Sequence, residues 1–293
     1  MADEARLISR TSPWRDTLCA YMPDISLDPE FLRTGTSWEH ELTALRLAAR
    51  PGDLIIDVGA GFGYLTCYLA YLAGPSGAVH AIEPSTAMLS LLIENVRRNG
   101  HRTVRANRVA VGSAAAPAAV LWLSRTNLGR HSLHRANVPG LAGHELVEQV
   151  TMDDYWRAEL GERPVGLVKI DVEGSELAVL RGAQDMLRST REVWLEFWPD
   201  GIGVTGSDPY EVLGLLRRAG FEVTCWNLLT GGRQQVPCEI LLRAMIADAR
   251  AWVAADGQGY SPILYLRGQR PDTPVDPAET SSGEMAGHHA PDQ

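Results

Sequence analysis

The sequence predicts an α/β fold, with a central, mostly parallel sheet of seven strands and helices on both faces of the sheet. Two observations carry this prediction. From Asp53 onwards, short apolar runs alternate with longer segments of helical periodicity, and the apolar runs are nearly continuous, as in strands that are buried on both faces. Such an alternation is typical of parallel sheets whose helical crossovers cover both sides.

The predicted elements follow in order along the chain. Strands are expected at 54–58, 78–82, 104–111, 166–172, 192–198, 221–226 and 263–266. Helices are expected at 38–49, 64–73, 86–99, 176–187, 209–219 and 239–255. Pro51, Gly74-Pro75 and Gly100 end the first three helices, because proline and glycine terminate helical segments.

Interruptions of this alternation set the predicted domain boundaries. Residues 1–50 are expected to form an N-terminal helical extension or lid, and residues 51–267 the main α/β domain. Within it, 113–150 is an insertion, with a strand at 118–123 and loop structure at 125–146, where glycine, proline and polar residues dominate. Residues 268–293 are rich in proline, glycine, serine and acidic groups, so a disordered tail is expected there.

Composition excludes several classes of protein. The net charge of −9 disfavours a general nucleic-acid partner, because such a surface repels phosphate backbones. The longest apolar stretches, 64–73 and 88–93, are too short to cross a membrane. The four cysteines form no C-x-x-C pair, which fits a reducing cytoplasm and disfavours a zinc site or a disulfide framework. We therefore expect a cytoplasmic protein with no nucleic-acid or membrane partner, and a homodimer stays open.

The strongest local signal is a glycine-rich turn, Asp57-Val58-Gly59-Ala60-Gly61-Phe62-Gly63, between a predicted strand and a predicted helix. Glycines let the backbone turn sharply and approach a ligand closely. In doubly wound folds nucleotides bind at this point, beyond the carboxyl ends of the strands. Glu83 ends the next predicted strand, where its carboxylate can accept hydrogen bonds from both hydroxyls of a ribose.

The charge beside the turn indicates which nucleotide binds. Dinucleotide enzymes favour G-x-G-x-x-G, because a pyrophosphate sits at the helix N-terminus. Here the spacing is G-x-G-x-G and Asp57 leads it. An acid at this place would repel a pyrophosphate but suits an ammonium group, such as that of S-adenosyl-L-methionine. The alternatives left open are an NAD-linked oxidoreductase, a cofactor-binding protein without catalysis, and a structural turn without a ligand.

A second motif, Lys169-Ile170-Asp171-Val172-Glu173-Gly174-Ser175-Glu176, ends the fourth predicted strand. Lys169, Asp171 and Glu173 fall on one side if the strand stays regular. Ionisable groups in a buried strand are costly unless they are paired or functional. The structural alternative is an ion pair of Lys169 with Asp171 or Glu173, with Glu173 or Ser175 capping the next helix.

Together these motifs resemble the FkbM family of class I S-adenosylmethionine-dependent methyltransferases, which have a Rossmann-like fold. The resemblance extends from about Gly52 to Trp226, and one residue departs from it, Gly61, where Asn is common in the family. It rests on the Asp57–Gly63 turn with Thr66, Glu83-Pro84, Asn107 with Ala110-Val111-Gly112, Lys169–Gly174 with Glu176, Gly182-Ala183, and Glu196. The resemblance implies methyl transfer, commonly to oxygen, on a small molecule, a sugar or a natural product.

Candidate site residues follow from the motifs and the resemblance. The candidates for binding the cofactor are Glu41, Asp57, Gly59, Ala60, Gly61, Gly63, Thr66, Glu83, Pro84, Asn107, Ala110 and Asp171. Glu41 precedes the first strand of the main domain, and either reaches the ammonium group of the cofactor or is a surface charge.

Four residues are the catalytic candidates: Asp171, Glu173, His131 and Glu196. Asp171 would orient the acceptor or face the cofactor, Glu173 or His131 would act as the base, and Glu196 would orient a polar acceptor. Trp198 is an aromatic wall for the acceptor or a core residue.

The same carboxylates raise the question of a metal ion. Asp171, Glu173 and Glu196 could hold a divalent ion through hard oxygen ligands, but no ligand-spacing signature accompanies them, so no metal is predicted. Transfer to nitrogen or to a carboxylate, which needs no strong base, is the alternative within methyltransferases.

Overall fold

The computed structural model describes residues 6–12, 14, 16–22, 39–125, 127–227, 232–256 and 264–271. The predicted disordered tail at 268–293 lies outside the described residues from position 272 onwards. Residues 268 and 269, which the prediction assigned to this tail, belong to a strand.

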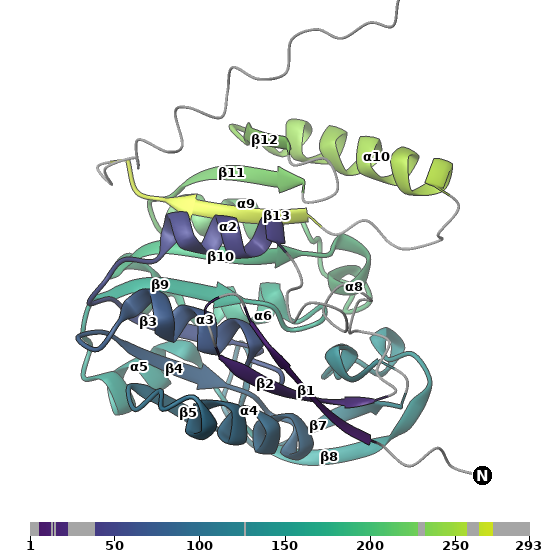
Figure 1. Cartoon of the computed structure of the whole chain (residues 1–293). Helices are drawn as coiled ribbons and strands as arrows, with labels where there is room; N and C mark the ends of the chain where they lie inside the picture. The colour runs from purple at the N-terminus through teal and green to yellow at the C-terminus, as the bar shows by residue number, and fades with distance from the viewer. Residues whose placement is uncertain are drawn as a thin grey trace, which may run out of the picture.

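The centre of the molecule is an eight-stranded sheet (Figure 1). From one edge to the other its strands are β12 (Gly232–Gln235), β11 (Glu222–Asn227), β13 (Leu264–Gln269), β10 (Thr190–Phe197), β9 (Val165–Ile170), β3 (Leu54–Val58), β4 (Ala78–Ile82) and β5 (Val104–Asn107). The pairs from β10 through β9, β3 and β4 to β5 are parallel, whereas β13 runs antiparallel to both of its neighbours. The sheet is therefore mostly parallel, as the sequence predicts.

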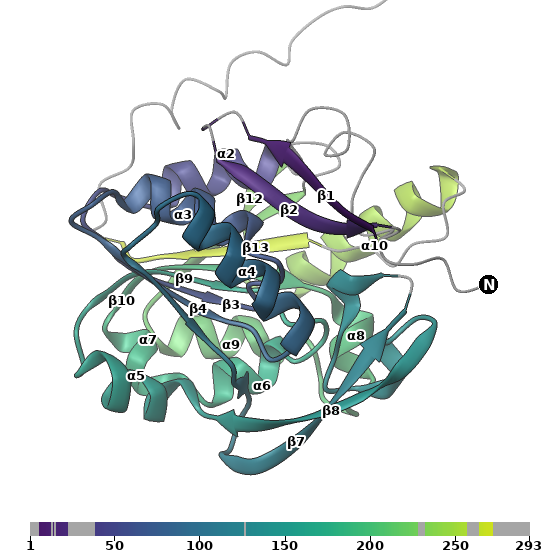
Figure 2. The same cartoon turned by 60° about the horizontal axis from the view of Figure 1, so that its bottom comes forward.

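Helices cover both faces of this sheet (Figure 2). One face carries α2 (Glu39–Ala48), α3 (Tyr64–Ala73) and α4 (Thr86–Arg98). The other carries α5 (Met152–Leu160), α6 (Glu176–Arg181), α7 (Gln184–Arg188) and α9 (Glu211–Arg218). A separate apolar cluster fills each side, and α10 (Glu239–Asp256) packs into the cluster on the α5 side. Among the described residues, none of the helices combines the length and apolar character that crossing a bilayer requires.

The prediction of seven strands is wrong by one, because β12 adds an eighth at the edge of the sheet. β12 is glycine and polar residues throughout, so it carries no apolar signal. The predicted strand at 104–111 also divides. After β5 the chain leaves the sheet, and β6 (Ala110–Val111) pairs instead with β8. The predicted helix at 176–187 divides into α6 and α7 at Gly182-Ala183.

The insertion forms a small sheet of its own, in the order β6-β8-β7. β7 (Ala116–Ser124) matches the predicted strand, whereas β8 (Leu141–Val150) corrects the prediction of loop structure up to position 146. The sequence conceals β8 because most of its residues are exposed or half-buried, and Val147 alone is fully buried. Val147 packs with Ala110 and Leu121 in a cluster separate from the main core. Two short 3-10 turns, η1 (Leu128–Arg130) and η2 (Arg135–Asn137), connect the two long strands.

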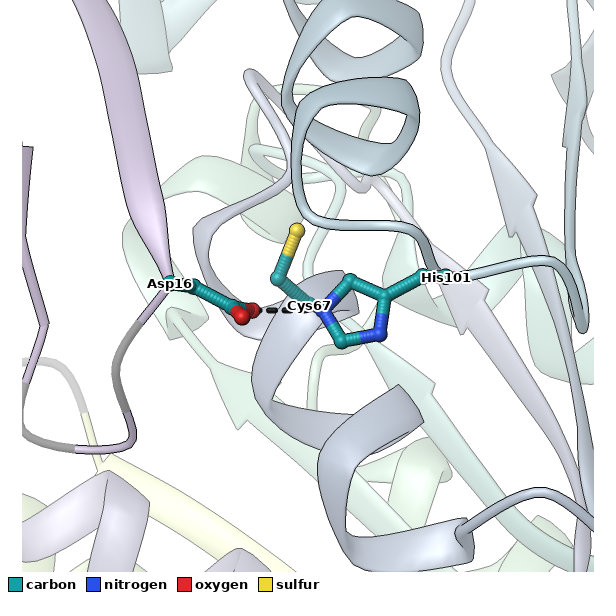
Figure 3. A group of neighbouring side chains, drawn as sticks. All are labelled: Asp16, Cys67 and His101. Carbon is teal, nitrogen blue, oxygen red and sulfur yellow. Dashed lines mark hydrogen bonds and ion pairs between the residues drawn. The ribbon is translucent and has the colours of Figure 1, made fainter.

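The N-terminal segment corrects a second prediction, since only part of 1–50 is helical. β1 (Arg6–Thr11) and β2 (Thr17–Met22) form an antiparallel hairpin. Asp16 in its turn lies 2.5 Å from Nε2 of His101, beside the thiol of Cys67 on α3 (Figure 3). The indole N–H of Trp14 donates to the same carboxylate oxygen of Asp16, over 3.1 Å. The hairpin is thereby attached to the helical layer of α3 and α4.

Candidate functional site

The glycine-rich turn joins β3 to α3 at the carboxyl edge of the sheet. Gly59 has a φ of +78°, and a Cβ built there would lie 1.7 Å from the backbone oxygen of Asp171. Gly63 has a φ of +88°, and a Cβ there would lie 3.1 Å from Leu92. Gly61 has a φ of +54° but faces open space. The first and last glycines are thus required by close packing, and the middle one leaves room beside the backbone.

Glu83 lies where a ribose-binding acid is expected. The backbone N–H groups of Gly61 and Ser85 each donate to one of its carboxylate oxygens over 2.8 Å. Burial raises the pKa of Glu83 to about 7, against the opposing effect of these two hydrogen bonds. Each carboxylate oxygen has a second lone pair, so both can still accept a hydrogen bond from a ligand hydroxyl. Pro84, which follows, is half-buried.

Asp57 has a different role from the predicted one. It is fully buried and accepts a hydrogen bond from Thr66 Oγ1 over 2.6 Å. Its other oxygen lies 3.2 Å from Nζ of Lys169, and the same ammonium group donates to Gly59 O over 2.8 Å. The charge of Asp57 is therefore neutralised within the protein, and we correct the expectation that it meets an ammonium group of the cofactor. Asp57, Thr66 and Lys169 support the turn from behind.

Glu41 on α2 is the acid that remains available to meet the ammonium group of a cofactor. The alternative of a surface charge is wrong, because Glu41 is 3% exposed. Its side chain forms a hydrogen bond with Tyr265 on β13, and burial raises the pKa of the Glu41 carboxyl group to about 7. Oε1 of Glu41 has no hydrogen-bond partner among the described residues. A buried acceptor without a partner is expensive, which indicates that a ligand donor group completes this place.

Two further cofactor-binding candidates are engaged elsewhere. The side-chain amide of Asn107 donates to the backbone oxygens of Ala81 and Arg105. Ala110 packs with Leu121 and Val147 inside the small sheet. Both side chains stabilise the end of β5 and the turn into β6. Their contribution to a cofactor site would be indirect, because they hold the backbone between β5 and β6 in place.

Three carboxylates converge beyond the ends of β9 and β10. Asp171, Glu173 and Glu196 each place an oxygen within 4.8 Å of the other two. Lys169 lies 3.4 Å from Asp171, so the ion pair named as the structural alternative is present with Asp171 as the partner. Glu196 is 5% exposed, and its pKa is raised well above the usual range, first by burial and then by the charges of Asp171, Glu173 and Glu176. The structure thus gathers three of the four catalytic candidates.

Glu173 is held in an unusual backbone conformation. Its φ of +52° lies in the left-handed region, which is strained for a residue with a side chain. Ser132 Oγ and Asn137 Nδ2 donate to its backbone oxygen over 2.8 and 3.1 Å, and Nε of Arg130 lies 3.1 Å from its carboxylate. Burial, and next the charge of Asp171, raise the pKa of Glu173 to about 8. Residues of the insertion therefore hold both the backbone oxygen and the carboxylate of Glu173.

The start of the following helix matches the prediction only in part. Ser175 is the N-cap residue of α6, but its side chain makes no capping hydrogen bond, and the carboxylate of Glu173 pairs with Arg130. Instead, Oε1 of Glu176 accepts hydrogen bonds from the backbone N–H groups of Val172 and Gly174. Glu176 thereby fixes the bend that follows β9, and Glu173 is left to face the other carboxylates.

The insertion closes over this part of the edge. Its Arg130 guanidinium lies over the ring of Trp198, 4.2 Å from the centroid, and Asn137 Nδ2 donates to Gly201 O in α8 (Pro199–Gly203). His131 belongs to the same segment, but its Nδ1 accepts a hydrogen bond from the backbone N–H of Ser124 over 3.1 Å. Nδ1 of His131 is therefore occupied by a structural contact within the insertion.

Sequence reasoning missed three residues of this site. Arg130 and Asn137 lie in a polar segment that was interpreted as loop, and only the neighbouring His131 was singled out. Tyr265 lies on β13 directly opposite Glu196, and almost the whole length of the domain separates it in sequence from Glu41. A tyrosine inside a short apolar run carries no signal of this contact.

Known proteins match the part of the chain that contains both the glycine-rich turn and the acidic cluster. The family model described as Methyltransferase FkbM domain matches residues 57–223. The chain is similar to the 31-O-demethyl-FK506 methyltransferase FkbM of Streptomyces tacrolimicus, at 34% identity over 202 residues, which are 59% of this chain and 74% of that protein. It is also similar to the hexuronic acid methyltransferase AglP of Haloferax volcanii, at 29% identity over 58% of this chain and 64% of that protein.

A solved structure also aligns with the chain over most of its length. This is the fibrillarin of Aeropyrum pernix with natively bound S-adenosyl-L-methionine, at a TM-score of 0.44 and 13% identity, covering 90% of this chain and 99% of the fibrillarin chain.

Proposed function

Since the chain belongs to the FkbM family of S-adenosyl-L-methionine-dependent methyltransferases, we propose that it methylates a hydroxyl oxygen of a small-molecule acceptor, a sugar or a natural product. The observation that supports transfer to oxygen is the position of Glu173. Its carboxyl group lies in the acidic cluster at the carboxyl edge, with a pKa of about 8. A group whose pKa lies near neutral pH is suited to accept a proton during the reaction.

The residues on the other half of the edge fit the methyl donor. Glu83 can accept hydrogen bonds from ribose hydroxyls, the open side of Gly61 admits a ligand close to the backbone, and Oε1 of Glu41 is a free acceptor for an ammonium group. S-adenosyl-L-methionine supplies an electrophilic methyl group when it is bound. Transfer forms an oxygen–carbon bond, breaks the carbon–sulfur bond and leaves S-adenosylhomocysteine.

The protein then has two tasks, alignment and proton removal. Asp171 follows the strand that contacts the glycine turn, so it connects the two halves of the edge and orients the acceptor. Glu173 takes the proton that the hydroxyl loses, and Glu196 accepts a hydrogen bond from a polar group of the acceptor. Alignment of this kind can contribute up to about 7–11 kcal/mol in ideal intramolecular cases.

The named relatives support the choice of acceptor class. One is named as a 31-O-demethyl-FK506 methyltransferase and the other as a hexuronic acid methyltransferase, and the first name specifies an oxygen as the methylated atom. Trp198 is 7% exposed and its ring is covered by the guanidinium of Arg130, so it is a core residue and not an aromatic wall for the acceptor. Transfer to a nitrogen or a carboxylate remains the second candidate, and it would make Glu173 dispensable.

We also propose that the reaction takes place in the cytoplasm, without nucleic acid or membrane as a partner. Cys67, Cys225 and Cys238 are free thiols, which supports a reducing compartment.

The test compares Glu173→Gln with His131→Gln. The products of the two variants and the unchanged chain are measured by mass spectrometry, as the gain of one methylene unit on hydroxylated ring compounds. Glu173→Gln should reduce kcat by about 10²–10⁴, because a general base is lost, while affinity for S-adenosylhomocysteine stays the same. His131→Gln, which retains an acceptor for Ser124, should have a far smaller effect. Full turnover of Glu173→Gln would contradict the assignment of the base.

A further inference from the structure

The acidic cluster Asp171, Glu173 and Glu196 has the spacing of a set of metal ligands. The three residues come from the ends of two adjacent parallel strands, and their oxygens lie within 4.8 Å of one another. Two oxygens that share one Mg²⁺ are at most about 4.2 Å apart, and two that share one Ca²⁺ about 5 Å. One hard cation could therefore contact all three carboxylates after at most a small side-chain movement.

Glu196 provides a second, separate observation. It is 5% exposed, and its Oε2 is enclosed without a hydrogen-bond donor among the described residues. No ion pair joins Glu196 to any arginine, lysine or histidine in the described part of the chain. Its carboxyl group instead lies within hydrogen-bonding reach of another carboxyl group, that of Asp171. A buried carboxyl group among other acids is neutralised by a proton or by a cation, and a cation would neutralise the three acids together.

The cations on either side of the cluster are already engaged. Lys169 contacts Asp171 but lies slightly closer to Asp57, at 3.2 Å against 3.4 Å, and donates its hydrogen bond to Gly59 O. Arg130 contacts Oε2 of Glu173 and covers Trp198 with its other face. Neither of them reaches Glu196 by a described contact, so neither serves as its counter-charge.

We infer that Asp171, Glu173 and Glu196 bind one divalent cation of the hard, oxygen-preferring class, Mg²⁺, Mn²⁺ or Ca²⁺. From the sequence these three residues could hold a divalent ion but no metal is predicted, because the ligands come from two strands and no spacing pattern joins them. The part that such an ion plays in the reaction rests on the proposed function. It would bind the acceptor oxygen and lower the pKa of the hydroxyl group.

The experiment measures binding directly. The full chain is freed of metal with a chelator and titrated with MnCl₂, and free Mn²⁺ is followed by electron paramagnetic resonance, with MgCl₂ and CaCl₂ as competitors. We expect saturable binding of one Mn²⁺ per chain. Glu196→Gln should weaken it by at least about tenfold, since even outer partners of a metal site change affinity by 10–100-fold. Glu94→Gln is the control, because Glu94 pairs with Arg97 and Arg98 on the exposed side of α4.

Each outcome decides the inference. Absence of saturable binding to the unchanged chain, or equal binding by Glu196→Gln and Glu94→Gln, overturns it. If Glu196→Gln does not fold, Asp171→Asn takes its place and the stoichiometry of the unchanged chain still decides. Binding of S-adenosylhomocysteine and turnover in chelator are measured in parallel. Full turnover in chelator without Mn²⁺ binding rejects the metal ion and leaves the methyltransferase proposal intact. Mn²⁺ binding without any product methylated at a hydroxyl group supports the metal site and rejects the proposed methylation of oxygen.

Discussion

The two halves of the carboxyl edge treat their acidic residues in opposite ways. In the half formed by β3 and β4, Asp57 is neutralised by Lys169 and Thr66, and Glu83 accepts two backbone N–H groups. In the half formed by β9 and β10, Asp171, Glu173 and Glu196 face one another. In the first half the innermost acid, Asp57, is paired within the chain, and Glu83 keeps acceptor positions for hydroxyl groups of a ligand. The second half has more acidic groups than its own cations neutralise, so it is arranged for partners that arrive from outside.

The backbone of Gly59 packs directly against that of Asp171 between the two halves, and disturbing this contact should have the largest effect. Gly59→Ala would place a Cβ 1.7 Å from the backbone oxygen of Asp171, at a φ of +78°. We expect the variant to lose binding of S-adenosylhomocysteine in calorimetry or to fail to fold. Gly100→Ala, at a φ of +71° just beyond α4 and away from the cofactor site, is the matched control. It meets no atom within 4 Å, so it should cost only the strain of the left-handed conformation, about 1–2 kcal/mol. Similar losses in both variants would show that packing between the halves is unimportant.

The internal neutralisation of the first half can be broken at Lys169, which is 2% exposed. Lys169→Met leaves Asp57 buried without a counter-charge, and the free energy of unfolding should fall by about 3–5 kcal/mol in urea denaturation. Adding Asp57→Asn should recover much of this loss, because the amide can still accept the hydrogen bond from Thr66. A loss below about 1 kcal/mol in Lys169→Met would mean that water or another cation replaces the lysine.

The second half depends on the insertion, and Asn137 tests that dependence. Asn137→Ala removes the hydrogen bonds to Glu173 O and Gly201 O and allows the strained backbone of Glu173 to relax. We expect kcat to fall by about tenfold, the equivalent of roughly 1.4 kcal/mol, with unchanged affinity for S-adenosylhomocysteine. Gln149→Ala removes a comparable amide–carbonyl bond to Ala114 within the small sheet and should leave kcat unchanged. Equal effects would assign the loss to the insertion as a whole.

The smallest expected effect is that of pH on the protein without ligands. Glu41, Glu83 and Glu176 have pKa values raised to about 7, and Glu173 to about 8, so the folded chain binds more protons than the unfolded chain between about pH 5 and 8. Stability from these groups is fully present below the unfolded pKa and is lost as the pH rises through the folded values. We expect the free energy of unfolding to fall by about 1 kcal/mol or more from pH 5.5 to 8. Glu41→Gln should flatten this dependence, and a rise with pH would contradict it.

The same contrast explains which features the sequence could predict. The order of strands and helices, the glycine turn and Glu83 follow from local patterns, because apolar runs and glycine spacing act within a few residues. The role of Asp57 could not be predicted, since its partner Lys169 lies on another strand. β8 was missed because it is mostly polar, and the β1–β2 hairpin because its attachment depends on a contact between Asp16 and the distant His101.

The sequence predicted which residues form the acidic cluster, but it did not predict how they are arranged. Asp171, Glu173 and Glu196 were all selected from their positions at strand ends. That their oxygens meet, and that Arg130 and Asn137 hold Glu173 from the insertion, depends on the bend after β9 at Gly174, where a Cβ would lie 2.2 Å from Asn137. Strand alternation assumes a regular backbone and therefore cannot show such a bend.

The separate apolar cluster of the small sheet has an evolutionary consequence. Because Leu121 and Val147 pack with Ala110 outside the main core, the segment 113–150 can exchange its outward-facing residues without disturbing the sheet that carries Glu83 and the glycine turn. A lineage could acquire a new acceptor by replacing this one segment through recombination, while it inherits the donor half unaltered. Ser132 and Asn137, which fasten the segment to Glu173, would be the positions that such an exchange has to retain.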